Sequence, residues 1–187
     1  PKVLEIGYNY LAADTLVDVA NPYLAELNQL TGETVNLTEP DGVSMVYVAR
    51  FVAPKFIPIH MPIGSRIPMY LSGGGRAYLS GLPDEDVHAA LQASDIRPFT
   101  QHTLTDPAAI FERIQAARSK GYATNKEEMF LGDMTLAAPV YGSHGLPVAA
   151  VHVVAPSSRW SMEDAELKMG SAIVQCARAI SNAIRTL

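Results

Sequence analysis

Hydrophobic residues recur with a helical period at the start of the chain. The pattern predicts one helix in VLEIGYNYL and a second from about Asp14 to Leu30, which Gly32 is well placed to cap. Pro22 lies inside the second stretch, so we expect it in a first turn or at a kink. The chain therefore begins with two helical segments.

The hydrophobic period then changes to that of β-strands. ETVNLTEP and VSMVYVARFV are rich in valine and threonine, and Asp41-Gly42 between them is a strong signal for a hairpin turn. KFIPIHMPIG predicts a further extended segment, and its prolines suggest the edge of a sheet.

The middle of the chain predicts three helices. One follows the glycines of SGGGRAYLSGL, and the next begins at LPDEDV, with acidic residues in its first turn. The third is the amphipathic stretch TDPAAIFERIQAARSKG. Either Thr105 or Asp106 caps this helix, Pro107 lies at its start, and Gly121 follows its end.

The last third of the chain predicts a second hairpin and a long helix. MTLAAPVYG and LPVAAVHVV are the two strands, joined by a turn from Gly142 to Gly145, and the helix runs from about Ser161 to Arg185. Helices and hairpins in this order predict an α+β domain, in which helices cover an antiparallel sheet.

Composition narrows the class of protein. The chain has 187 residues, of which 48% are hydrophobic and 18% charged, as expected for one domain with a sizeable core. A net charge of -5 without a dense basic patch argues against direct nucleic-acid binding by these residues. The apolar runs are too short for a membrane span. The chain has a single cysteine, Cys176, which excludes an internal disulfide and fits a reducing cytoplasm. Because the chain starts at Pro1, we expect further residues before it.

Gly73, Gly74 and Gly75 stand where a helix begins, although glycine disfavours a helix by roughly 1 kcal/mol relative to alanine. They do not form a dinucleotide-binding motif, because Tyr78 occupies the place of its third glycine, nor a P-loop, because no lysine follows. Two interpretations stay open. The glycines form a tight turn without a ligand, or they free backbone N–H groups for an anion at a helix N-terminus.

The histidines show no metal-binding spacing, and we predict neither a metal nor a cofactor. The five are His60, His88, His102, His144 and His152. We expect His88 and His144 to be solvated, on a polar helix face and in a turn. His152 lies in VAAVHVV, a nearly pure core strand. It is either a core histidine satisfied by its neighbours or a histidine that faces an internal pocket.

Catalytic arrangements are not evident among the remaining residues. Glu127 and Glu128 could form a carboxylate pair, but neighbours on a strand point to opposite faces, so a structural or surface role is favoured. Cys176 is expected to pack inertly, and Trp160 to pack where the last helix begins. Ser161 with Asp164 resembles a capping box. We predict a pocket and no enzyme.

Four segments resemble a known family in their order and spacing: GSRIPMYLSGGGRAYLSGL, ARSKGYATNKEEMFLGDMTLAAPVY, LPVAAVHVVAPSSRW and CARAISNAI. Nearly the whole chain resembles the C-terminal effector-binding domain of bacterial transcriptional regulators of the isocitrate lyase regulator (IclR) family. The resemblance implies that residues 1–12 end an interdomain linker helix and that residues 13–187 form the effector-binding domain. It also implies that operator DNA is bound by an N-terminal winged helix-turn-helix domain absent from this chain.

The implied fold is GAF-like, with a curved antiparallel sheet flanked by helices that enclose a ligand cavity. The implied partners are a small organic or aromatic carboxylate effector and further copies of the chain, in a homodimer or a dimer of dimers. The implied location is cytoplasmic, with no membrane. The carboxylate would lie at the glycine-led helix, with His152 as an additional hydrogen-bond partner.

The family's ligand positions correspond here to Gly73, Gly74, Asn125, Asp133, Thr135, His152 and Val154. Asn125 stands where aspartate is frequent, and Thr135 where cysteine is common. His152 and Val154 replace small hydroxyl residues, while Asp133 places a possible charge at a commonly apolar position, where it faces either the pocket or solvent.

The leading hypothesis is a ligand-sensing domain of a transcriptional regulator, acting on a catabolic operon, in which effector binding shifts the arrangement of the subunits. Two alternatives stay open. One is an enzyme on the same fold, with His152 as base beside Asp133 or Thr135. The other is an oligomerisation module with a vestigial pocket.

Overall fold

The computed structural model describes residues 2, 7, 14–53 and 61–186. The linker helix predicted for residues 1–12 falls almost entirely outside these residues. Most of the extended segment predicted in KFIPIHMPIG, including His60, also lies outside them.

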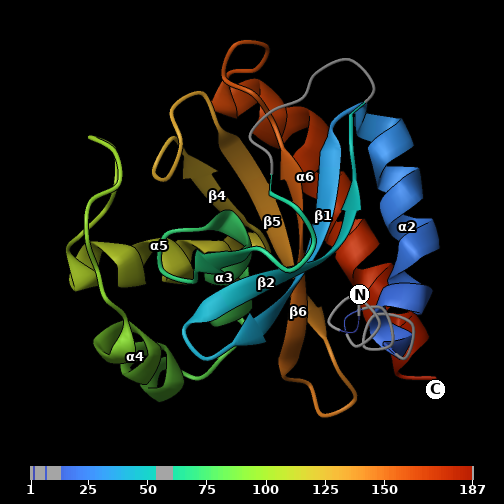
Figure 1. Cartoon of the computed structure of the whole chain (residues 1–187), viewed down its shortest axis with the longest axis horizontal. Helices are drawn as coiled ribbons and strands as arrows, with labels where there is room; N and C mark the ends of the chain where they lie inside the picture. Colours follow the sequence, from blue (N-terminus) through green and yellow to red (C-terminus); the bar gives the residue numbers. More distant parts are fainter. Residues whose placement is uncertain (1, 3–6, 8–13, 54–60, 187) are drawn as a thin grey trace.

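Six strands of the described residues form one antiparallel sheet in the order β3-β2-β1-β6-β5-β4. The strands are β1 (Thr34–Asp41), β2 (Ser44–Phe51), β3 (Arg66–Pro68), β4 (Ala123–Lys126), β5 (Met134–Tyr141) and β6 (Pro147–Val154). The helices are α2 (Thr15–Thr31), α3 (Gly73–Ser80), α4 (Asp84–Ala93), α5 (Pro107–Lys120) and α6 (Met162–Ile184). The sheet is curled, with helices on both faces (Figure 1), so the predicted α+β class is confirmed.

Alternation along the central strands separates two hydrophobic cores. Val151 and Val153 of β6 pack in the core formed with α2 and α6, whereas Ala150 packs in the core formed with α3, α4 and α5. His152 is two residues after Ala150 and therefore points to the same face of the sheet, away from α2 and α6. Figure 1 shows α6 behind the sheet, and α3 and α5 on the opposite side.

The predicted helix ends agree with the observed caps. Asp14 caps α2 by accepting the Leu16 N–H at 3.0 Å, and Gly32 ends that helix with a φ of 68°. Asp106, one of the two predicted candidates, caps α5. Ser161 caps α6 and accepts the Asp164 N–H at 3.0 Å. Pro22 lies inside α2, beyond its first turn.

The two sheet edges differ from the sequence prediction. β4 was not predicted as a separate strand, because four residues are too few for a clear period. Glu127, treated as a strand residue, follows β4 with a φ of 57°. At the other edge β3 begins at Arg66, after the predicted extended segment, whose described residues 61–64 belong to no strand.

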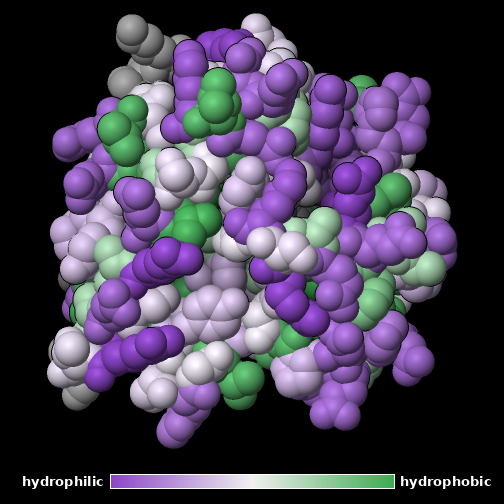
Figure 2. Space-filling model, turned by 180° about the vertical axis from the view of Figure 1, so that it is seen from behind, coloured by the Kyte–Doolittle hydropathy of each residue, from purple (hydrophilic) through white to green (hydrophobic). Residues whose placement is uncertain are grey.

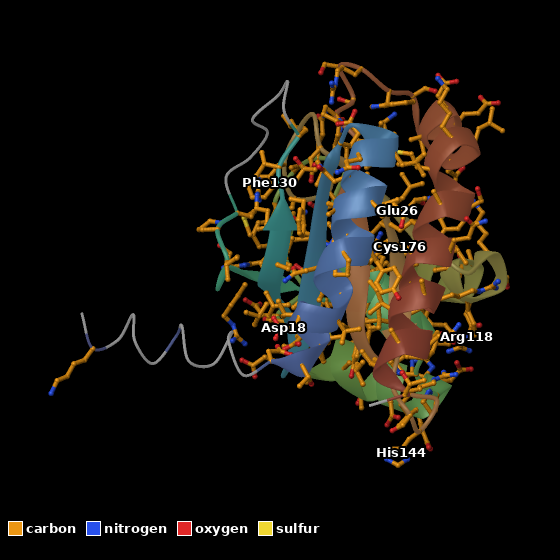
Figure 3. All side chains as sticks on the ribbon, turned by 90° about the vertical axis from the view of Figure 1, so that its right-hand side faces the viewer. Asp18, Glu26, Arg118, Phe130, His144 and Cys176 are labelled. Carbon is orange, nitrogen blue, oxygen red and sulfur yellow. The ribbon has the colours of Figure 1, made fainter. Side chains whose placement is uncertain are left out.

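The layer of α2 and α6 covers one face of the sheet. Figure 3 shows the two helices side by side, with the labelled Cys176 on α6 near Glu26 of α2. Burial raises the pKa of the Cys176 thiol to about 12, which agrees with an inert packing role. Seen from behind, the surface is mostly hydrophilic with separate hydrophobic areas (Figure 2). No helix of the described residues is long and apolar enough to cross a membrane.

Candidate functional site

A cavity lies between the N-terminus of α3 and the sheet face that contains His152. All the predicted ligand positions line it: Gly73, Gly74, Asn125, Asp133, Thr135, His152 and Val154. The cavity volume is about 40 Å³, so the cavity is narrow and has room for only a small group.

Polar side chains of β1 form part of the cavity wall. Asn36 and Thr38 line the cavity. Their neighbours in the strand, Val35 and Leu37, point to the other face and pack toward α2 and α6. Asn36 lies directly opposite His152 in the ladder between β1 and β6. The sequence analysis missed both polar residues, although their alternation with apolar residues in ETVNLTEP is the signal that could have identified them.

His152 faces this cavity and is only 3% exposed. Its Nε2 lies 3.0 Å from Nδ2 of Asn36, and the Tyr47 ring meets it edge-on with 5.4 Å between the centroids. Burial, and secondarily the charge of Arg50, lower the pKa of His152 to about 4. The imidazole is therefore neutral at pH 7, with one nitrogen satisfied by the protein.

Three buried atoms at the cavity have no hydrogen-bond partner within the described part of the chain. They are Oδ1 of Asn36, Oγ1 of Thr135 and Nδ1 of His152. Leaving a buried polar group unsatisfied costs about 1–3 kcal/mol, so such atoms usually bind water or a ligand. The cavity thus has the polar groups that a bound molecule would need.

The N-terminus of α3 forms another part of the wall. Ser72 caps the helix by accepting the Gly75 N–H at 3.0 Å, which leaves the N–H groups of Gly73 and Gly74 without an acceptor among the described residues. A Cβ at Gly75 would lie 2.3 Å from the Met69 backbone. Close packing therefore explains Gly75, and donors for an anion are available only at the first two glycines.

Asp133 lines the cavity and is half-buried, so its carboxyl also keeps some contact with solvent. Burial raises the pKa of its carboxyl to about 6, and no described residue donates a hydrogen bond to it. Arg50 lines the same cavity and donates from Nη1 to the Met61 carbonyl at 2.7 Å. The site therefore combines a permanent cation with a carboxyl that titrates near neutral pH. The sequence analysis missed Arg50, since nothing local distinguishes it from a surface arginine.

The last two predicted ligand positions, Asn125 and Val154, lie at the β4–β5–β6 side of the cavity. Nδ2 of Asn125 donates to the Leu71 carbonyl at 2.5 Å, which joins β4 to the segment before α3. Val154 pairs with Thr135 across the sheet. Asn125 thus holds the wall of the cavity together, whatever else it binds.

Glu127 and Glu128 do not act as a carboxylate pair. Glu128 is buried and forms a bidentate ion pair with Arg76, with contacts of 2.6 and 2.7 Å. Glu127 accepts hydrogen bonds from the Gly132 N–H and the Ser157 hydroxyl, which lower its pKa. Both roles are structural, as the sequence analysis favoured, but their position in a loop rather than a strand is a correction.

Of the other described histidines, none lines the cavity. His88 and His144 are exposed, as expected, and His88 stacks on Phe111 with 4.4 Å between the ring centroids. The described residues contain no group of three histidine, cysteine or acidic side chains that could hold a metal ion.

Comparisons with known proteins identify the family. The family profile described as bacterial transcriptional regulator IclR C-terminal matches residues 8–182. The chain belongs to the IclR family of transcriptional regulators. The predicted family is thus confirmed, and because its members are regulators rather than enzymes, the enzyme alternative is not supported.

Individual IclR-family relatives cover almost the whole chain. The HTH-type transcriptional repressor AllR of Escherichia coli K12 is 32% identical over 182 residues, which are 97% of this chain and 67% of AllR. A transcriptional regulator of Rhodococcus sp. RHA1 has 35% identity and a TM-score of 0.93, covering 100% of this chain and 76% of that one. The inducer-binding domain of PobR from Acinetobacter has 26% identity and a TM-score of 0.80, covering 88% of this chain and 97% of that one.

Proposed function

We propose that this IclR C-terminal domain binds a small organic or aromatic carboxylate in the cavity and thereby controls transcription of a catabolic operon. In this proposal, operator DNA is bound by a winged helix-turn-helix domain outside these residues. The regulator acts in the cytoplasm as a homodimer or a dimer of dimers, and residues 13–187 form the sensing unit.

The convergence of donors on one cavity supports a carboxylate guest. The N–H groups of Gly73 and Gly74 lie at a helix N-terminus, where the helix dipole favours negative charge. Arg50 adds a permanent positive charge to the same wall. A carboxylate between these groups would receive charge-assisted hydrogen bonds, which are the stronger class in proteins.

The relatives support the same interpretation. The solved PobR inducer-binding domain is a double mutant in complex with 3-hydroxybenzoic acid, an aromatic carboxylate. AllR is a repressor with a helix-turn-helix. By analogy, these relatives favour a small acid as the effector of this chain and operator binding as the output of the whole regulator.

Effector binding would act through the two sides of the cavity. One side is the start of α3, and the other is the sheet of β1, β5 and β6. A ligand that contacts both sides favours the arrangement in which they are close, so it shifts the population toward that arrangement. Transmission to the DNA-binding domains then requires that the two arrangements differ at the subunit contacts.

A ligand screen tests the proposal. We expect a panel of small aliphatic and aromatic carboxylates to include compounds that raise the melting temperature and bind in isothermal titration. His152→Ala should weaken the binding of such compounds, whereas His144→Ala, a change in the exposed hairpin turn, should leave it unchanged. Failure of every acid to bind would contradict the proposal and favour a vestigial pocket, and turnover of a bound acid would favour an enzyme.

A further inference from the structure

Asn36 and His152 face each other across two neighbouring strands at the wall of the cavity. They are 1% and 3% exposed, and Nδ2 of Asn36 lies 3.0 Å from Nε2 of His152. Their remaining polar atoms, Oδ1 of Asn36 and Nδ1 of His152, have no partner among the described residues. Each residue therefore uses one polar atom on the other and has one buried polar atom without a partner among the described residues.

The hydrogen bond between Asn36 and His152 determines which of their remaining polar atoms is a donor and which is an acceptor. When the amide Nδ2 donates to Nε2, the neutral ring holds its proton on Nδ1, which leaves one N–H donor and one carbonyl acceptor. When the amide is turned by 180°, its oxygen accepts from Nε2–H, so Nδ1 becomes the acceptor and the amide nitrogen the donor. In both arrangements the pair offers one donor and one acceptor.

The surroundings keep this pair uncharged. The charged and titratable groups that face His152 are Arg50 and Tyr47 of β2, with Asp133 on the same cavity wall. Burial and the Arg50 guanidinium both disfavour an imidazolium. A carboxylate guest would therefore meet a neutral imidazole at His152 and form no ion pair with it.

We propose that Asn36 and His152 form a neutral recognition pair for an uncharged group of the effector that both donates and accepts hydrogen bonds, such as a primary amide or a hydroxyl. The effector's carboxylate binds instead to the N-terminus of α3 and to Arg50. This inference rests on the proposed function, and it adds a second polar group to the effector. An effector without such a group would leave Oδ1 and Nδ1 buried and unsatisfied.

The charge state of the pair can be tested without any ligand. In protein labelled with ¹⁵N-histidine, the ring nitrogens of His152, assigned with His152→Gln, should show a neutral imidazole at pH 7. Asn36→Asp should convert this ring to an imidazolium, because a carboxylate then faces Nε2. Asn36→Leu should leave the ring neutral. An imidazolium at pH 7 in the parent would overturn the proposal.

Three four-carbon probes test the recognition itself. Butyrate, succinate and succinamate share one carboxylate and differ at the other end, which is a methyl group, a second carboxylate or a primary amide. The parent should bind succinamate about tenfold more tightly than either of the others, as expected for two neutral hydrogen bonds. Asn36→Leu should remove this preference for succinamate, with circular dichroism as the check on folding.

The outcomes separate this inference from the proposed function. If the parent binds butyrate or succinate as tightly as succinamate, or if Asn36→Leu keeps the preference, the recognition pair is wrong while carboxylate binding stands. If none of the three probes binds but other acids of the panel do, the pair is also contradicted. If no acid binds at all, the proposed function fails together with this inference.

Discussion

At the scale of single residues, two titratable groups of the cavity, the half-buried Asp133 and the buried His152, have opposite pKa shifts. The pKa of Asp133 is raised to about 6, so the folded state loses stability as pH rises from about 4 to 6. The pKa of His152 is lowered to about 4, so the folded state loses stability as pH falls from about 6.5 to 4. Each shift corresponds to about 3 kcal/mol, and the two effects nearly cancel in this range.

Substitution of either group should therefore make the pH dependence of stability that the other group causes measurable. Relative to the parent, His152→Gln should become more stable as pH falls from 6 to 4, by up to about 3 kcal/mol, because only the Asp133 effect is left. Asp133→Asn should show the reverse, a loss of stability over the same range. Urea denaturation at a series of pH values measures both, and profiles parallel to that of the parent would contradict the shifts.

Residue by residue, the sequence predicted part of this site. The seven ligand positions came from the family resemblance, and all of them line one cavity. Asn36 and Arg50 were not found, because their role depends on which strands lie beside β6 and β1. The neutral state of His152 also depends on burial from several elements, which no local pattern records.

At the scale of elements, the start of α3 is defined by how closely it approaches its neighbours. A Cβ at Gly75 would lie 2.3 Å from the backbone of Met69, which cannot give way as a flexible side chain can. A Cβ at Gly74 would lie 3.0 Å from Oγ1 of Thr38 and 3.3 Å from Nδ1 of His152. Close packing therefore accounts for part of the glycine run, while anion binding by the N–H groups of Gly73 and Gly74 stays a prediction.

Gly75→Ala should destabilise the domain by roughly 3 kcal/mol, because overpacking outweighs the gain of about 1 kcal/mol in helix propensity. Gly74→Ala is the matched control, and it should cost clearly less, since side chains rather than backbone must move. Chemical denaturation compares the two variants. Equal losses would contradict the assignment of Gly75 as the residue in closest contact.

A buried ion pair fixes α3 to the loop after β4. Arg76 is 1% exposed, and besides Glu128 it donates from Nε to the Tyr70 carbonyl at 2.8 Å. The partners are 52 positions apart in the sequence, so no local spacing predicted the contact. Glu128 also accepts the Leu104 N–H, and the ion pair therefore ties three segments around the cavity together.

Removing one partner of this ion pair should destabilise the domain more than replacing both partners by apolar residues. Arg76→Met should destabilise the domain by about 3–5 kcal/mol, because it leaves the Glu128 carboxylate buried without its partner. The double variant Arg76→Met with Glu128→Leu should recover part of that loss, since no charge is then left buried. A denaturation double-mutant cycle measures the coupling, and simple additivity of the single effects would contradict it.

At the scale of the whole molecule, the sequence predicted the class of fold better than its topology. Both hairpins were predicted, because each is local and has a turn signal between two strands. The pairing of β1 with β6, which brings Asn36 opposite His152, joins residues 116 positions apart. Such pairings depend on packing of the entire chain, so the cavity at their junction could be expected from the family resemblance but not from periodicity.

Self-association is the last expectation at this scale. Leu30 on α2 is 72% exposed and lines grooves between α2 and α6. Figure 3 shows the layer that these two helices form. Burying a leucine contributes about 2 kcal/mol, so such a residue favours a subunit contact. We therefore expect a homodimer or a dimer of dimers by sedimentation velocity at micromolar concentration.

Two substitutions locate the contact. Leu30→Asp should shift the protein toward the monomer, because it would place a charge in the contact. Leu146→Asp is the matched control, since Leu146 is 50% exposed and lies in the hairpin loop between β5 and β6 rather than on α2 or α6. Equal sedimentation of both variants and the parent would place the contact elsewhere on the surface, and a monomeric parent would contradict the assembly itself.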